Sequence, residues 1–384
     1  MKTTFYNAKV ITPEVIIEGG IVADNGKIVS VFKGDEYEKG GNSIDCKGNY
    51  LTPGFVETHI HATINGQFAT KEPEEMERAC MLIADHGTTS VLATSGSRPI
   101  QQVYDMFDTV GKLKGKNRGA NLIGAHLEGI YLNTEYAGAQ MPGAQHYPVE
   151  EEYMRLYDTG LLKRVSASPE LPGALEMART LSSKGVLMSI AHSGASHEEV
   201  LAAIDAGYSH VTHMYNALSY LDNCYYFPKI GVCEAALLHD EITVEAICDG
   251  CHVPLDLLQL IYKVKGAEKF HATSDAVCAG GVEGDEVQGG KAIIKNNVCV
   301  LKDKDVFDGS CATSERLIRN LVKANIPLID AIKMVSLTPA KTVGEKNIGR
   351  IAAGYDADIN ILDESFNVLY TMIKGKEYKR TNAL

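Results

Sequence analysis

The sequence contains no long hydrophobic run. No stretch of its 384 residues approaches the roughly 18 consecutive apolar residues of a membrane helix. The first residues, Met1–Asn7, turn polar before an apolar core forms, so we do not expect a signal peptide. With 45% hydrophobic and 22% charged residues, the composition is that of a globular protein and excludes disordered, collagen-like and coiled-coil chains.

Positive charge is also scarce. The 37 Lys and Arg residues stand against 49 Asp and Glu residues, which gives a net charge of −12. A basic footprint for nucleic acid is absent, and the acidic surface would not attract anionic substrates from a distance. Any phosphate group must therefore be bound by local groups. The odd number of cysteines, nine, predicts free thiols in a reducing cytoplasm, and we interpret Cys248-Asp249-Gly250-Cys251 as incidental.

Both ends of the chain are rich in short β-branched runs. The predicted strands are Asn7–Ile11, Gly20–Asp24, Lys27–Phe32, Ile359–Leu362 and Val368–Ile373. Asp24-Asn25-Gly26 is a hairpin signal. Because two β segments flank a long insert, we expect residues 1–52 and 348–384 to form one small β-sandwich domain together.

The middle of the chain, 53–347, alternates between apolar runs and helical patterns. The eight predicted strands are Gly54–His61, Thr88–Thr94, Asn121–Glu128, Arg164–Glu170, Val186–Ser193, His210–Asn216, Ile242–Asp249 and Phe270–Val277. The predicted helices include Glu74–Asp85, Gly173–Lys184, Glu198–Ala206, Leu255–Val264, Ala312–Ala324 and Leu328–Val335. Eight such units favour an α/β fold of the (β/α)₈ TIM-barrel type. The alternative, a doubly wound open sheet, usually has a glycine-rich turn after its first strand, where this chain has His-x-His.

Polar residues follow most of these predicted strands. In a barrel the carboxyl ends of the strands carry the functional site, and two long connections, Gly129–Pro148 and Met214–Ile230, are expected to shape its pocket. Ionisable groups that converge in a buried place repel or desolvate one another unless a cation is present. The candidate residues are His59, His61, His126, Glu128, Glu170, His192, His213, Asp249 and Asp275.

Imidazole and carboxylate together suit Zn²⁺ or Fe²⁺. His59 and His61 lie two apart on a predicted strand, so they face the same side, as a chelating pair must. A metal at this place lowers the pKa of a bound water to about 7. A carboxylate that is not needed as a ligand can then move protons, and Asp275 is the candidate; its other interpretation is a helix N-cap.

Several segments resemble the amidohydrolase superfamily, and within it the N-acetylglucosamine-6-phosphate deacetylase family. The motifs are His-x-His at 59–61, H-L-E-G at 126–129, A-H-S at 191–193, T-H-M-Y-N-A at 212–217, D-G-C-H-V at 249–253, Gly309-Ser310 with R-N-L-V at 319–322, and the closing G-R-I-A-A-G-Y-D-A-D at 349–358. The resemblance covers nearly the whole chain.

The resemblance implies a site and a reaction. Glu128, His192 and His213 would bind the principal metal, and His59 with His61 would allow a second one. Asp275 would be the general base and then the general acid. Asn216 and Ala217 would contact the sugar or its phosphate, and His252 would reach the phosphate, across a homodimer interface. The implied reaction releases acetate from an N-acetyl amino sugar phosphate.

The chain departs from the family pattern where substrate is bound. Gln140, in Gly138-Ala139-Gln140-Met141-Pro142, stands where the family has a histidine, and nearby His146 is an alternative for that role. The loop after the sixth strand lacks the family's phosphate-binding arginine, which leaves Lys229 as its nearby cation, and it carries aromatic residues at 220 and 225–227. The alternatives are therefore another N-acyl amino sugar, another N-acyl compound, or a metal-binding ligand sensor without turnover.

Overall fold

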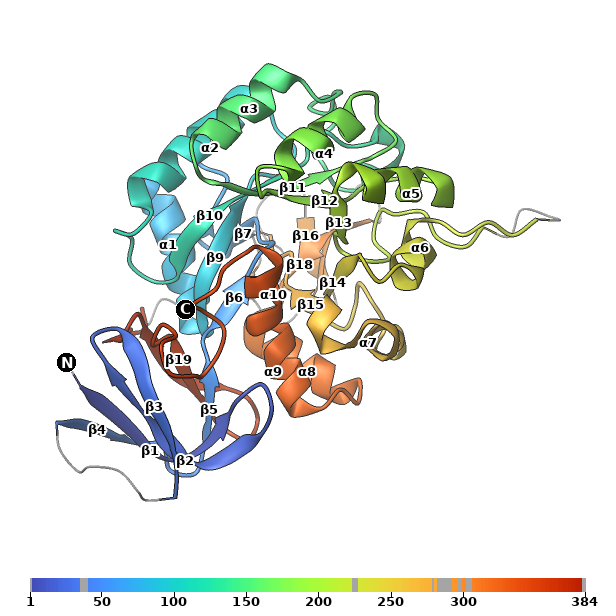
Figure 1. The fold of residues 1–384 in the computed structure, drawn as a ribbon. Helices are drawn as coiled ribbons and strands as arrows, with labels where there is room; N and C mark the ends of the chain where they lie inside the picture. Colours follow the sequence, from blue (N-terminus) through green and yellow to red (C-terminus); the bar gives the residue numbers. More distant parts are fainter. Residues whose placement is uncertain are drawn as a thin grey trace.

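The computed structural model describes residues 2–34, 41–222, 227–277, 280–281, 292–295, 298–301 and 306–381. A ring of helices surrounds a parallel sheet, and a β-rich part made from both ends of the chain lies beside it (Figure 1). The predicted α/β barrel with a small β domain is confirmed. Among the described residues no helix is both long and apolar enough to cross a membrane.

The parallel sheet has eight strands in the order β15-β14-β13-β12-β11-β10-β9-β6. Backbone hydrogen bonds join its two ends, because Asp275 N donates to His59 O at 3.1 Å and His61 N donates to Ala276 O at 2.9 Å. The sheet is therefore a barrel rather than an open doubly wound sheet. Its strands are β6 (Phe55–Glu57), β9 (Thr88–Thr94), β10 (Asn121–Glu128), β11 (Leu162–Ala167), β12 (Leu187–Ile190), β13 (Tyr208–Val211), β14 (Thr243–Ile247) and β15 (Phe270–Thr273).

Amphipathic helices cover the outside of the barrel, with apolar side chains such as Met76, Val103 and Met177 buried against it. All six predicted helices are present, and α2, α3, α6 and α10 come in addition. The helices are α1 (Pro73–Asp85), α2 (Ile100–Leu113), α3 (Glu150–Asp158), α4 (Ala174–Ser182), α5 (His197–Ala206), α6 (Val232–Leu238), α7 (Leu255–Lys269), α8 (Ser314–Lys323), α9 (Leu328–Met334) and α10 (Leu337–Thr342).

Several barrel strands are shorter than predicted, and the difference falls at the carboxyl ends. The sixth strand ends at Val211 rather than Asn216, and the eighth at Thr273 rather than Val277. His192, His213 and Asp275 have positive φ angles of 45°, 30° and 46°, which a strand does not allow. These polar residues thus lie in turns immediately beyond the strands, where they point into the mouth of the barrel.

The small domain is one connected sheet in the order β21-β20-β19-β5-β1-β2-β3, with β4 paired to β1. Its own apolar core includes Phe5, Ile21, Ile359 and Met372. The strands are β1 (Thr3–Ile11), β2 (Ile16–Asp24), β3 (Lys27–Lys33), β4 (Asn42–Asp45), β5 (Tyr50–Pro53), β19 (Ile359–Leu362), β20 (Val368–Ile373) and β21 (Lys376–Glu377). The boundaries 1–52 with 348–384 against 53–347 stay a prediction.

Two further additions lie at the mouth of the barrel. A small sheet of β16 (Ala292–Lys295), β17 (Val298–Leu301) and β18 (Phe307–Ser310) was not predicted, and it joins the eighth barrel strand through Val277 N, which donates to Ser310 O. A short hairpin of β7 (Ala62–Thr63) and β8 (Gly66–Gln67) follows β6. Of the nine cysteines, seven lie in the described parts, and Cys46, Cys80, Cys233 and Cys248 among them carry free thiols.

Asp358 is a buried carboxyl at the start of β19. Its Oδ1 accepts a hydrogen bond from Lys374 N, while its Oδ2 has no partner. Burial raises the pKa of Asp358 from 3.8 to about 7. The folded protein therefore binds more protons than the unfolded chain between pH 4 and 7, so the contribution of Asp358 to stability is full below about pH 4 and falls as the pH rises to about 7.

The Asp358→Asn variant is expected to lose this pH dependence, because asparagine keeps the acceptor for Lys374 N and cannot ionise. Relative to the wild type, its free energy of unfolding should rise by up to about 4 kcal/mol between pH 4 and pH 7. Urea unfolding of both proteins across this range measures the difference. A constant difference would show that Asp358 is already ionised at pH 4 in the folded protein.

Candidate active site

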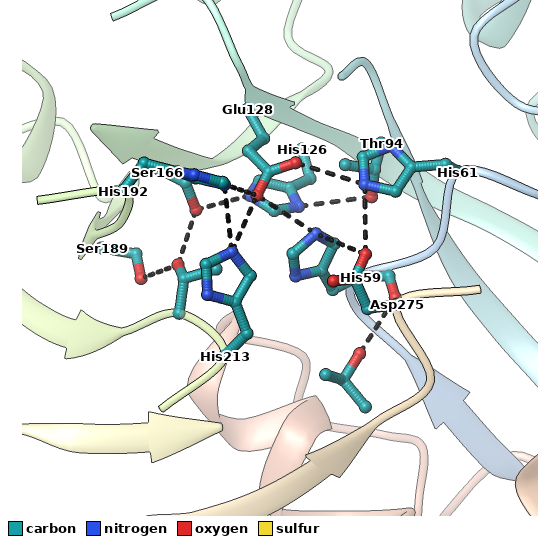
Figure 2. A network of polar contacts seen from close by, with 12 residues as sticks. His59, His61, Thr94, His126, Glu128, Ser166, Ser189, His192, His213 and Asp275 are labelled. Carbon is teal, nitrogen blue, oxygen red and sulfur yellow. Dashed lines mark hydrogen bonds and ion pairs between the residues drawn. The ribbon is translucent and has the colours of Figure 1, made fainter. Parts of the chain in front are cut away.

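Six ionisable side chains from five strands meet at the mouth of the barrel (Figure 2). Glu128 is the last residue of β10, and the others lie just beyond β6, β12, β13 and β15. They are the predicted His59, His61, Glu128, His192, His213 and Asp275. Four of them are buried, and His61 and Asp275 are partly exposed, so most of these groups are poorly solvated.

Glu128 is the centre of this group. Its Oε1 lies 3.3 Å from His59 Nε2, 3.6 Å from His192 Nε2 and 3.5 Å from His213 Nε2. Its Oε2 lies 3.2 Å from His61 Nε2. The residues form two triads, His59–His61–Glu128 and Glu128–His192–His213, whose ligand atoms each lie within 4.8 Å of one another. The two triads share a single carboxylate.

The donor atoms fit a divalent metal. His59 Nε2 and Glu128 Oε1 are buried and have no hydrogen-bond partner. Buried polar atoms without partners are costly, and a cation bound between them would supply the missing interaction. Imidazole nitrogen and carboxylate oxygen are ligands that Zn²⁺ and Fe²⁺ both accept.

Hydrogen bonds on the far side of two of the rings orient His59 and His192. His59 Nδ1 lies 2.7 Å from Glu245 Oε1, and His192 Nδ1 lies 2.8 Å from Tyr136 O. These partners favour a proton on Nδ1, which leaves the Nε2 lone pairs free to face Glu128. Such contacts fix the ring orientation that metal binding needs.

Beneath the ligands lies a buried ion pair. The guanidinium of Arg164 donates to Glu245 Oε2 at 2.6 Å and to Glu245 Oε1 at 2.8 Å, and both side chains are completely buried. Glu245 also forms a possible metal-ligand group with His210 and His271. Because Arg164 already neutralises this carboxylate, we interpret the group as the structural floor of the site. Burial lowers the pKa of His210 to about 4 and that of His271 to about 3, so both rings are neutral.

The Asp275 side chain lies on the edge of the first triad. Its Oδ1 is 3.4 Å from His59 Nε2 and 3.2 Å from His61 Nε2. Burial opposes ionisation of this carboxyl, but the neighbouring His59 and His61 outweigh it and lower the pKa of Asp275 below its usual range. Asp275 is therefore a carboxylate that can accept a proton. The described residues that follow Asp275, at 276 and 277, are not helical, so its side chain does not cap a helix there.

A cavity of about 320 Å³ opens above these residues. Both long loops line it, as predicted, through residues 138–141 and through Asn216 and Ala217. His252 lines it as well, so within one chain this residue reaches the same cavity as Glu128 and Asp275 and needs no dimer interface to do so. Its Nδ1 lies 2.7 Å from Asp249 Oδ2, which fixes the ring.

Gln140 replaces the expected histidine and lies inside the site. Its Nε2 donates to Glu128 Oε2 at 3.2 Å, and its Oε1 accepts from Ser97 N at 2.7 Å. His146 does not line this cavity; it contacts Glu152 and packs against Tyr131. It therefore does not take over the position of the missing histidine.

Lys229 is not among the residues that line the cavity. It lies on an exposed arm between β13 and α6, where its backbone pairs with that of Asp222. The arm extends away from the barrel near α5 and α6 (Figure 1). The predicted aromatic residues Tyr225 and Tyr226 lie outside the described residues.

Several residues of the site were not predicted from the sequence. Arg98, after β9, and Asp308, in β18, line the cavity, while Glu245 holds His59 from below. A charged residue inside the apolar run of β14 was the available signal for Glu245, because a buried carboxylate needs a partner. Arg98 follows β9, and the predicted strand at this place is the one for which no polar end residue was a candidate.

The sequence pattern of the amidohydrolase family matches residues 50–378. The chain belongs to this family. Curated relatives include the N-acetylglucosamine-6-phosphate deacetylase of Lysinibacillus sphaericus, 28% identical over 93% of this chain and 92% of that one. The N-acetylgalactosamine-6-phosphate deacetylase of Escherichia coli O157:H7 is 26% identical over 85% of this chain and 87% of that one.

Solved structures of the same group superpose on nearly the whole chain. The N-acetylglucosamine-6-phosphate deacetylase of Pasteurella multocida has a TM-score of 0.90 at 26% identity and covers 98% of this chain and 99% of its own. A mutant of the Mycobacterium smegmatis enzyme, solved in complex with N-acetyl-D-glucosamine-6-phosphate, has a TM-score of 0.89 at 27% identity with the same coverage. The chain is a metal-dependent hydrolase with the fold of these deacetylases.

Proposed function

We propose that this amidohydrolase removes the acetyl group of N-acetylglucosamine 6-phosphate, giving acetate and glucosamine 6-phosphate. The observation that carries the proposal is the pair of metal-ligand triads sharing Glu128, with Asp275 beside them at the floor of the cavity. The names and bound substrate of the similar proteins support the choice of sugar phosphate.

The bound metal would polarise the amide carbonyl and make a water molecule acidic. Asp275, on the edge of the His59–His61–Glu128 triad, is placed to take the proton of the attacking water and to return it to the leaving nitrogen. Gln140 projects its amide toward Glu128 and is a hydrogen-bond donor near the reacting carbonyl. The products are the carboxylate and the free amine.

The sugar phosphate would bind in the part of the cavity that lies across the barrel mouth from β9. Asn216, Ala217 and His252 line that part and offer amide and imidazole groups. Asp249 fixes the His252 ring through Nδ1, which leaves Nε2 for the ligand. We assign the phosphate to these residues, since Lys229 lies on the arm outside the cavity of its own chain.

Acetate release from metal-analysed protein tests the proposal. N-acetylglucosamine 6-phosphate and unphosphorylated N-acetylglucosamine are compared side by side, and kcat/KM is expected to favour the phosphate by at least about 10-fold, the value of one good charged contact. Turnover of neither sugar at full metal occupancy would contradict the assignment.

A second candidate is hydrolysis of a different N-acyl amino sugar. It is favoured by Gln140 in place of a histidine and by the absence of any arginine between 214 and 230. Under this alternative the same assay gives a higher kcat/KM for the unphosphorylated sugar, or, when other epimers are added to it, for one of those. Decay to a sensor without turnover is disfavoured, because all six metal-site and base residues are present and converge.

We further propose Zn²⁺ or Fe²⁺ as the metal, one or two ions per chain, and a cytoplasmic location in keeping with the free thiols. We also propose a homodimer formed through the arm between β13 and α6. Three apolar side chains of the arm are exposed: Tyr220 by 63%, Leu221 by 52% and Phe227 by 78%. An exposed apolar cluster of this kind is typical of a protein interface.

The Phe227→Ser variant is expected to weaken the dimer. In sedimentation experiments the wild type should have twice the 41.6 kDa mass of one chain. The dissociation constant of the variant dimer should be about 10-fold higher than that of the wild type, because an aromatic anchor at an interface contributes at least about 1.4 kcal/mol. Leu369→Ser, a similar change at an exposed residue of β20, is the control and should leave the mass unchanged. A monomeric wild type would contradict the proposal.

A further inference from the structure

Arg98 brings a permanent positive charge into the active-site cavity. Among the described residues that line the cavity, it is the one lysine or arginine. A Cβ placed on Gly96 would lie 3.3 Å from His61 Nδ1 and 3.9 Å from Arg98 NH2, so the guanidinium and the metal-ligand His61 both border Gly96. The Arg98 side chain is therefore at the reacting end of the cavity.

The charge of Arg98 is not neutralised by the protein. Its NH1 donates to the carbonyl oxygen of Ala69 at 2.7 Å, and its Nε is buried without a partner. In the part of the chain that the structure describes, no carboxylate forms an ion pair with it. Asp308 lines the same cavity but is not within ion-pair distance of Arg98. A partly buried guanidinium without an ion-pair partner is costly unless a bound anion compensates its charge.

The place of Arg98 differs from that of the proposed phosphate site. Arg98 follows β9, whereas Asn216 and Ala217 follow β13, and these two strands are four apart on a closed ring of eight. The two groups of residues therefore lie on opposite sides of the barrel mouth, with the metal-ligand triads between them. A substrate whose sugar phosphate lies at Asn216 and whose amide lies at the metal extends its acyl chain toward β9.

We propose that Arg98 binds a carboxylate at the far end of the acyl group, so that the enzyme also hydrolyses N-acyl amino sugars whose acyl chain is a dicarboxylic half-amide, such as N-succinyl. The planar guanidinium matches a carboxylate through two parallel hydrogen bonds. This inference deepens the proposed function and depends on it, since hydrolysis of the same amide bond would release a dicarboxylate in place of acetate.

The test compares three substrates: N-acetylglucosamine, its 6-phosphate and N-succinylglucosamine. In the Arg98→Met variant, kcat/KM for N-succinylglucosamine is expected to fall by about 10–100-fold, the value of a charge-assisted pair. The fall in kcat/KM for the two acetyl substrates should be at least about 10-fold smaller than this. Arg98→Lys should restore only part of the loss, because lysine lacks the planar fork. Arg179→Met, on the exposed face of α4, removes an equal charge as the control.

Three results would overturn the inference. The wild type would cleave the acetyl substrates and not N-succinylglucosamine, or Arg98→Met would lower kcat/KM for all three substrates equally, or the loss would fall on the 6-phosphate alone, which would assign Arg98 to the phosphate. If the wild type cleaves none of the substrates, the proposed function fails. Calorimetric binding of succinate to the metal-loaded protein then tests Arg98 separately, and equal affinity of wild type and Arg98→Met would overturn its role.

Discussion

The Asp275→Asn variant is expected to release acetate about 10²–10⁴-fold more slowly than the wild type, with its metal content unchanged. Asparagine keeps the size of the side chain and its contacts with His59 and His61, but it cannot accept a proton at neutral pH. The amide would also leave Glu128 and the four histidines free to bind metal. Measuring kcat together with metal content therefore separates proton transfer from metal binding.

Two outcomes of this experiment would contradict the mechanism. Activity that survives the substitution would show that another group moves the proton. A parallel loss of metal and activity would show that Asp275 is mainly a ligand. Asp308→Asn is a matched control, because its carboxyl lines the same cavity but belongs to neither metal-ligand triad; its effect on kcat should be far smaller.

The Glu128→Ala variant is expected to lose metal from both triads at once. Glu128 is the one residue common to the two groups, whereas His59 belongs to a single group. Activity should fall by at least about 10³-fold, because several kcal/mol of charge stabilisation depends on the metal. Elemental analysis of the dialysed protein, alongside the activity assay, measures both effects.

His59→Ala provides the comparison for Glu128. It removes one ligand of the His59–His61–Glu128 triad and leaves Glu128, His192 and His213 together. Its metal content should therefore stay above that of Glu128→Ala. Equal metal content in the two variants would show that the triads do not bind metal as separate groups that share one carboxylate.

Much of the fold could be predicted from the sequence. The runs at 88–94, 121–128, 359–362 and 368–373 coincide with β9, β10, β19 and β20, because each is a compact apolar segment bounded by polar residues. At the hairpin signal 24–26, Asn25 and Gly26 have φ angles of 49° and 80°, as a tight two-residue turn requires. Local pattern and tertiary structure agree at these places.

The ends of the strands could not be predicted so well. His213 and Asp275 continue apolar runs in the sequence, but in the structure they adopt left-handed backbone conformations beyond β13 and β15. Such conformations are costly for residues other than glycine and are kept where the surrounding structure imposes them. The packing of neighbouring loops, which no local pattern reports, decides where these strands end.

The residues of the two triads and the loop residues Gln140, Asn216, Ala217 and His252 could be singled out from the sequence, whereas Arg98 and Asp308 could not. Histidines at strand ends signal a metal by their chemistry alone. Arg98 lies on a connection without periodicity and Asp308 in the unpredicted strand β18, and both line one cavity only because β9 and the sheet containing β18 come to the same barrel mouth. The two residues are more than two hundred positions apart in the chain, so no local pattern brings them together.

The buried Arg164–Glu245 pair affects how genetic variation in this protein would be interpreted. Loss of Arg164 leaves Glu245 buried and uncompensated, a change that typically costs 3–5 kcal/mol, and it also frees the carboxylate that orients His59. A carrier of such a substitution would lack the activity although no residue that touches substrate has changed. In a screen for inactive alleles, Arg164 would be scored with the catalytic residues, and only a measurement of folded protein abundance would separate the two classes.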